Sequence, residues 1–220
     1  MDSGENTKQK GKRLEKIITV LQPLYPRLKP MLHYKTPFQL LVATVLAAQC
    51  TDAMVNTVTP ALFSRYPDPK ALSEAPLDDL ETIIHSTGFY RAKSRNIKTL
   101  SAILTADYSG EVPRTMDELT RLPGVGRKTA GVVLSAFFDV PAIIVDTHFM
   151  RVTRRMGFTD SDNPAHIEKD IAAAAPESQW TAISHILNQH GRAVCHARKP
   201  ECGVCTAEYL CPKNGVPEKP

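Results

Sequence analysis

The stretch LPGVGRKTA, Leu122 to Ala130, lies between two segments that have the periodicity of helices. Its Pro-Gly-Val-Gly part predicts a tight hairpin, in which Gly124 and Gly126 can take backbone angles closed to other residues. The N–H groups at the start of the following helix have no intrahelical partner, so they can bind a phosphate oxygen. Glycine-rich helix connections are common, so this turn alone predicts a local structure and not a function.

Lys128 falls in the first turn of the helix that follows the hairpin. At that position the positive end of the helix dipole disfavours the ammonium form of the side chain. Only the neutral amine is a nucleophile, so the position suits a lysine that forms a covalent bond with a substrate.

Apolar residues elsewhere repeat with the 3.6-residue period of an α-helix. They are Phe38, Leu41, Val42, Val45 and Leu46; Ile97, Leu100 and Leu104, in a helix from about 90 to 106; Ala130, Val133, Leu134 and Phe137, at 127 to 138; and Trp180, Ile183 and Leu187. Asn163 and Pro164 are typical of an N-cap and a first helical residue, and Gly191 is typical of a C-terminal stop. No segment alternates with period two for long enough to require a sheet. The sequence predicts an all-α fold of about ten short helices.

Composition places the chain among ordinary globular proteins, with 42% hydrophobic and 23% charged residues and a net charge of +4. The longest apolar stretch, Leu40 to Ala48, is too short to cross a bilayer. The N-terminal MDSGENTKQK has no apolar segment typical of a secretory signal, so we expect a reducing, cytoplasmic location. Arg151, Arg154 and Arg155 form a basic group that fits either a nucleic-acid partner or a solvated face.

Four of the five cysteines, Cys195, Cys202, Cys205 and Cys211, have the spacing C-x6-C-x2-C-x5-C. In a reducing compartment this crowded spacing disfavours disulfides and indicates a metal. Four thiolates along one continuous segment suit a 4Fe-4S cluster, while zinc and free thiols stay open as alternatives. Cys50 stands apart and is interpreted as a buried small hydrophobic residue.

Asp146 follows an apolar run and precedes a helical pattern in IIVDTHFMRV, residues 143 to 152. This position predicts an N-cap. A capping carboxylate is held rigidly, and rigid placement also suits a general acid or base.

These motifs in this order, together with PFQLLVATVLAAQCTD (37–52) and TGFYRAKSRNIK (87–98), resemble endonuclease III in the helix-hairpin-helix DNA glycosylase superfamily. The resemblance covers about residues 12 to 211. It implies a six-helix barrel domain at 30–140, with the helix-hairpin-helix motif at about 115–138. It further implies a 4Fe-4S cluster domain formed by 1–29 and 141–220, and a DNA-binding cleft between the two domains.

The resemblance implies a bifunctional DNA glycosylase and AP lyase of base excision repair that removes oxidised pyrimidines of the thymine glycol type. Lys128 would attack the sugar C1′ of a flipped nucleotide and form a Schiff base, with Asp146 as its acidic partner, and β-elimination would then cleave the strand. The implied partner is double-stranded DNA with damaged bases or abasic sites. We expect a monomer associated with the nucleoid, and no membrane.

Several DNA contacts are implied as well. Gln49 matches the residue that fills the gap left by the flipped base. Phe89 stands where the family commonly has a leucine that wedges into the opposite strand, although without the family it would be interpreted as a core residue. The remaining expected contacts are Gly124, Val125, Gly126, Arg127 and Thr129 in the hairpin, His148 after Asp146, and Arg198 and Lys199 in the loop between the first two cluster cysteines.

Two alternative functions can be weighed against this one, another glycosylase and a protein that is not an enzyme. A mismatch-specific adenine or thymine glycosylase of the same superfamily normally lacks the catalytic lysine, and the adenine enzyme has a glutamate where this chain has Thr44. A cluster-bearing DNA-binding protein without activity would not require both Lys128 and Asp146.

Overall fold

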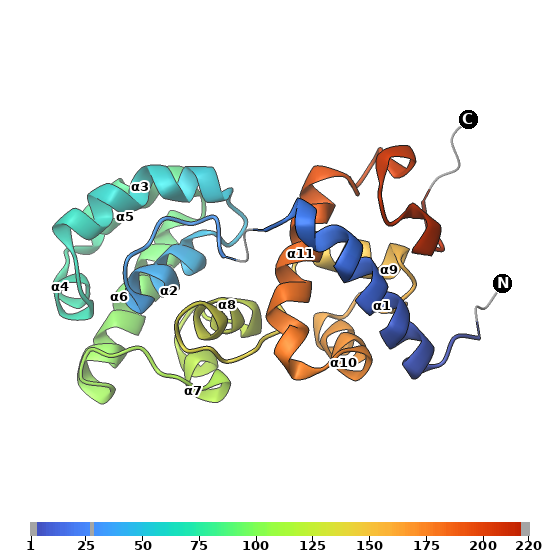
Figure 1. Cartoon of the computed structure of the whole chain (residues 1–220). Helices are drawn as coiled ribbons and strands as arrows, with labels where there is room; N and C mark the ends of the chain where they lie inside the picture. Colours follow the sequence, from blue (N-terminus) through green and yellow to red (C-terminus); the bar gives the residue numbers. More distant parts are fainter. Residues whose placement is uncertain (1–3, 27–28, 217–220) are drawn as a thin grey trace. The chain divides into compact units, whose positions relative to one another are not determined.

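A computed structural model describes residues 4–26 and 29–216 of the chain (Figure 1). Regular structure in these residues is entirely helical, which confirms the prediction of an all-α fold. The elements are α1 (Thr7–Leu21), η1 (Gln22–Leu24), α2 (Pro37–Leu46), α3 (Asp52–Arg65), α4 (Pro69–Glu74), α5 (Leu77–Ile84), η2 (His85–Thr87), α6 (Tyr90–Asp107), α7 (Met116–Arg121), α8 (Arg127–Phe137), α9 (Thr147–Arg155), α10 (Pro164–Ala174), η3 (Glu177–Gln179), α11 (Trp180–Ala193), η4 (Cys202–Val204) and η5 (Glu208–Leu210), where η marks short 3-10 helices. Among these helices, none has the length and apolar character that a membrane span requires.

The described residues fall into two compact units. Unit 1 combines those of Met1–Lys29 with those of Pro141–Pro220, and unit 2 consists of Pro30–Val140. Unit 1 thus joins the N-terminal helix α1 to the C-terminal part of the chain, while unit 2 is continuous in sequence and contains α2 to α8.

The centre of unit 2 is α2, whose side chains from Leu40 to Leu46 are all buried. The sequence predicted an apolar stripe on one face, but the helix is enclosed on every side, as expected for a helix without a polar face. Thr44 is compatible with this burial because its Oγ1 donates a hydrogen bond of 2.7 Å to the carbonyl of Leu40. Helices α6 and α8 pack against α2 and occupy the positions that periodicity predicted.

Unit 1 has a core formed by α1, α9, α10 and α11 together with the C-terminal loop (Figure 1). Leu14, Ile17 and Leu21 point from α1 into this core, where Phe149 of α9 is fully buried. Asn163 caps α10 by accepting a hydrogen bond from the N–H of Ala165, as predicted.

Gly191 has a different role from the predicted one. It was expected to stop its helix, but α11 continues to Ala193 and Gly191 is buried inside it. A Cβ atom at this position would lie 3.0 Å from Cβ of His148 and 3.0 Å from Cγ2 of Val152, both on α9. The glycine is therefore explained by the close approach of α9 and α11.

Replacing Gly191 by alanine tests this packing. Although alanine favours a helix by up to about 1 kcal/mol, we expect the overpacked methyl to lower the free energy of unfolding by about 1–3 kcal/mol. Urea titration measures the change. Gly203→Ala is the control, because a Cβ there would meet nothing within 4 Å. Equal stability of the two variants would contradict the account.

Candidate active site and metal centre

The predicted hairpin connects α7 to α8 in unit 2. Gly124 has a φ of 77°, and a Cβ at this residue would lie 2.8 Å from Nδ2 of Asn96 on α6. Glycine is required there for both its conformation and its size. The N–H of Val125 closes the turn with a hydrogen bond of 3.1 Å to the carbonyl of Leu122.

Gly126 differs from the prediction, because its φ of −95° and ψ of 174° are open to any residue. It is the N-cap of α8, and a Cβ there would meet nothing within 4 Å. In the part of the chain that the structure describes, no side chain caps this helix. Gly126 therefore adds no side chain beside the first turn of α8.

Lys128 is exposed in the first turn of α8, as are Gly124, Gly126 and Arg127 around it. Thr129 is half-buried and Val125 is buried. Val125 can therefore contact DNA only through its backbone, since its side chain packs inside unit 2.

Gln49 and Phe89 share an uncommon backbone conformation. Both are exposed and have left-handed backbones, with φ of 53° and 50°. Gln49 lies in a turn after α2 rather than within that helix, and Phe89 is the N-cap of α6. Phe89 is 68% exposed, so its interpretation as a core residue is wrong. Cys50, predicted to be buried, is half-buried.

Asp146 is the N-cap of α9 in unit 1, as predicted. Its Oδ1 accepts hydrogen bonds from the N–H groups of His148 (3.0 Å) and Phe149 (2.8 Å). Its Oδ2 accepts a hydrogen bond from the side-chain amide of Asn188 on α11. The carboxylate is therefore held from two helices, and Asn188 is a contact that sequence reasoning missed, because the two residues are far apart in the chain.

The basic group on α9 mostly faces inward. Arg151 donates to the carbonyls of Cys195 (3.0 Å) and Gly191 (2.7 Å), and its Nη2 lies 3.2 Å from Nδ1 of His148. Burial lowers the pKa of His148, against the opposing effect of the Asp146 carboxylate. Of the three arginines only Arg154 is exposed, so the group is not a single DNA-facing patch.

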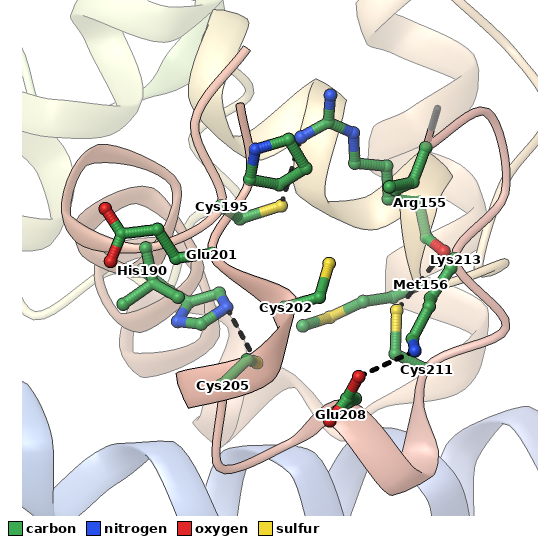
Figure 2. Close-up of a pocket in the computed structure, with 13 residues that line it drawn as sticks. Arg155, Met156, His190, Cys195, Glu201, Cys202, Cys205, Glu208, Cys211 and Lys213 are labelled. Carbon is green, nitrogen blue, oxygen red and sulfur yellow. Dashed lines mark hydrogen bonds and ion pairs between the residues drawn. The ribbon is translucent and has the colours of Figure 1, made fainter. Parts of the chain in front are cut away.

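All four clustered cysteines line one pocket of unit 1, with an empty volume of about 370 Å³ that is partly open to solvent (Figure 2). In Figure 2 the sulfurs of Cys195, Cys202 and Cys211 point toward a shared space beside Met156. Burial is the main cause that raises the pKa of Cys205 and Cys211, and the neighbouring sulfurs raise it further. A positively charged group between the sulfurs would favour the thiolates, so the donor set fits a metal cluster.

Two buried side chains lie within hydrogen-bonding distance of these sulfurs. Arg155 lies 3.4 Å from Sγ of Cys195 and also donates to the carbonyls of His196 (2.6 Å) and Ala197 (2.8 Å). His190 of α11 has its Nε2 3.5 Å from Sγ of Cys205. Both contacts appear as dashed lines in Figure 2. Sequence reasoning identified neither residue as a neighbour of these cysteines.

The loop between the first two cysteines carries Arg198 and Lys199, both exposed as predicted. Its backbone is held by Arg155 and by a hydrogen bond of 3.0 Å from the N–H of Glu201 to the carbonyl of Val194. The loop thus presents two cations on a segment fixed beside the cysteine pocket.

Comparison with known proteins identifies the class to which this fold and these residues belong. Residues 42–177 match the HhH-GPD superfamily of base excision DNA repair proteins. The chain is 48% identical to endonuclease III of Synechocystis sp., over 92% of this chain and 93% of that protein. It is 44% identical to endonuclease III of Bacillus subtilis, over 91% and 92% of the two chains.

A solved structure of a trapped covalent intermediate between endonuclease III and DNA has a TM-score of 0.88 and 44% identity, and covers 92% of this chain and 96% of that one. The chain belongs to the endonuclease III family, the DNA glycosylases and AP lyases of base excision repair.

Replacing Arg155 by lysine tests whether this arginine stabilises unit 1 through its hydrogen bonds to the carbonyls of His196 and Ala197. Lysine keeps the charge but lacks the planar fork that reaches several acceptors. We expect the free energy of unfolding to fall by about 1–3 kcal/mol, because the carbonyls of His196 and Ala197 lose a charged donor. Urea titration measures the loss, and Arg154→Lys on the exposed face of the same helix is the control. An unchanged free energy of unfolding in Arg155→Lys would contradict the assignment.

Proposed function

We propose that the protein removes oxidised pyrimidines of the thymine glycol type from duplex DNA, with Lys128 as the nucleophile. The observation that carries the proposal is the exposed Lys128 in the first turn of α8, directly after the glycine hairpin. The family relative trapped as a covalent intermediate with DNA supports a covalent mechanism.

In the first step the damaged nucleotide leaves the duplex and its sugar approaches Lys128. The neutral amine attacks C1′, the N-glycosidic bond breaks, and the base departs with a proton. Asp146 stabilises the positive charge that develops at the sugar and accepts and returns protons. Its two backbone N–H donors and Asn188 keep the carboxylate in one orientation during these transfers.

In the second step the opened sugar is joined to Lys128 as an iminium ion, which acidifies the C2′ hydrogens. Removal of a C2′ proton forms a carbon–carbon double bond, and the C3′–O bond breaks with the 3′ phosphate as the leaving group. Hydrolysis of the imine then frees the lysine. A glycosylase that used water for base excision would not need this amine.

We infer that two groups of residues hold the duplex. The hairpin supplies backbone N–H groups and the helix dipole of α8, together with Arg127 and Thr129, for one phosphate. Gln49 and Phe89 enter the base stack from exposed turns, while His148, Arg198 and Lys199 contact the backbone from unit 1. We also propose that the protein acts as a monomer at the nucleoid in the cytoplasm, where duplex DNA is found.

We propose a 4Fe-4S cluster held by Cys195, Cys202, Cys205 and Cys211, one thiolate on each iron. When bound, the cluster cross-links the C-terminal loop. The pocket lined by all four sulfurs and the donors that face two of them support this assignment. The resulting domain roles are a glycosylase barrel at 30–140 and a cluster domain at 1–29 and 141–220.

Lys128→Gln separates catalysis from binding. Glutamine keeps a polar side chain of similar size but cannot form an imine, so base excision and strand cleavage should fall to background on a thymine glycol duplex. Binding should stay within about threefold of wild type, because the hairpin amides are unchanged. A gel assay with the lesion duplex measures both. Normal cleavage by the variant would contradict the assignment, and inactive wild-type protein would favour the DNA-binding alternative.

Asp146→Asn tests the acidic partner. Asparagine still accepts the capping hydrogen bonds but cannot transfer a proton, so turnover should fall by roughly 10²- to 10⁴-fold. Asp162→Asn, at an exposed position, is the control. Equal activity of the two variants in single-turnover assays would exclude the proposed role.

The purified protein should be brown and contain about four irons per chain. Metal analysis and visible absorption measure this directly. Cys202→Ala should reduce the yield of soluble protein, because the terminal loop loses a ligand, while Cys50→Ala should retain both colour and iron. Stoichiometric zinc without visible absorption would refute the cluster.

A further inference from the structure

His190 lies between a cluster cysteine and a tyrosine from the other end of the chain. It is 2% exposed, and its Nε2 is 3.5 Å from Sγ of Cys205 (Figure 2). On its other side, Nδ1 is 3.2 Å from the hydroxyl of Tyr25, the residue that ends η1. The two rings meet edge to face, with centroids 5.9 Å apart. The three side chains therefore form one hydrogen-bonded row.

The direction of both hydrogen bonds follows from the chemistry of the end groups. The imidazole of His190 is buried, which disfavours its charged form, so it carries one N–H. The Tyr25 hydroxyl has a proton to donate. A thiolate that ligates iron has no proton to donate. The only consistent arrangement has Tyr25 donating to Nδ1 and His190 Nε2–H donating to Cys205.

We propose that His190 is a positioning residue of the metal centre, whose Nε2–H donates to the Cys205 thiolate and raises the reduction potential of the cluster, with Tyr25 selecting the tautomer. This inference rests on the cluster proposed above. It gives His190 a role as a hydrogen-bond donor rather than a metal ligand, because the nitrogen that faces the sulfur carries the proton.

The expected effect on the potential has a definite sign. A donor to a ligating sulfur withdraws electron density from it and so favours the state of the cluster with one more electron. His190 contributes a hydrogen-bond donor at Cys205, whereas Arg155 at Cys195 contributes both a donor and a positive charge. Removal of the His190 donor should therefore shift the midpoint potential to a more negative value.

The test compares three variants of the full-length protein loaded with its cluster. His190→Leu removes the donor. His190→Gln retains an N–H₂ group near the position of Nε2. Tyr25→Phe removes only the hydroxyl that selects the tautomer. Redox titration followed by visible absorption and electron paramagnetic resonance gives each midpoint potential, and iron analysis gives the loading.

We expect a negative shift in His190→Leu, recovery of most of that shift in His190→Gln, and a smaller negative shift in Tyr25→Phe. An unchanged potential in an iron-loaded His190→Leu would overturn the inference. So would the same shift in the leucine and glutamine variants, because that result would indicate a packing effect and not a donor.

A second measurement uses the wild-type protein alone and so does not depend on buried substitutions. Nitrogen NMR of wild-type protein labelled at histidine should show His190 protonated at Nε2 and unprotonated at Nδ1. A proton on Nδ1 in the wild type would overturn the inference. Failure of the cluster proposal is distinguishable, since wild-type protein would then lack iron and visible absorption.

Discussion

The left-handed backbone of Gly124 is the constraint on which the exposed start of α8 depends. With φ at 77° and Asn96 packed against it, the chain reverses within the few residues between α7 and α8. This reversal starts α8 at Arg127, so that its first turn is exposed. In the proposed function this exposed turn would bind a phosphate at the helix N-terminus and would also place the Lys128 amine. A side chain at residue 124 would strain the turn and collide with the Asn96 side chain, so both proposed roles would be affected together.

In unit 1, two arginines hold the C-terminal part of the chain through hydrogen bonds to backbone carbonyls. Arg155 is buried and Arg13 is half-buried. Arg13 on α1 donates to the carbonyls of Met156 (2.6 Å) and Leu210 (3.3 Å) and stacks on Phe158, while Arg155 donates to His196 and Ala197. These contacts tie the loop to α1 and α9 before any metal is considered. The proposed cluster would complete a loop whose backbone is already held by the protein.

Features set by neighbouring residues could be predicted from the sequence, whereas features set by distant residues could not. Periodicity placed α2, α6 and α8, and the caps at Asp146 and Asn163 follow from local chemistry. Gly191 was interpreted as a helix stop because the residues that require a glycine there, His148 and Val152, lie on α9 and are distant in sequence. The partners of His190 and Arg155 could not be predicted either, since Tyr25 and His190 are 165 residues apart and no local pattern reports such a contact. The positive φ of Gln49 and Phe89 likewise depends on how their turns pack.

The central claim is that the amine of Lys128 forms the covalent bond with DNA, and the most direct measurement locates that bond in the wild-type protein. Borohydride reduction during reaction with a thymine glycol duplex converts the imine to a stable amine linkage. Digestion and mass spectrometry then identify the modified residue. The account predicts a single adduct on the peptide that contains Lys128. An adduct on the N-terminal amine or on another lysine, with Lys128 unmodified, would contradict it.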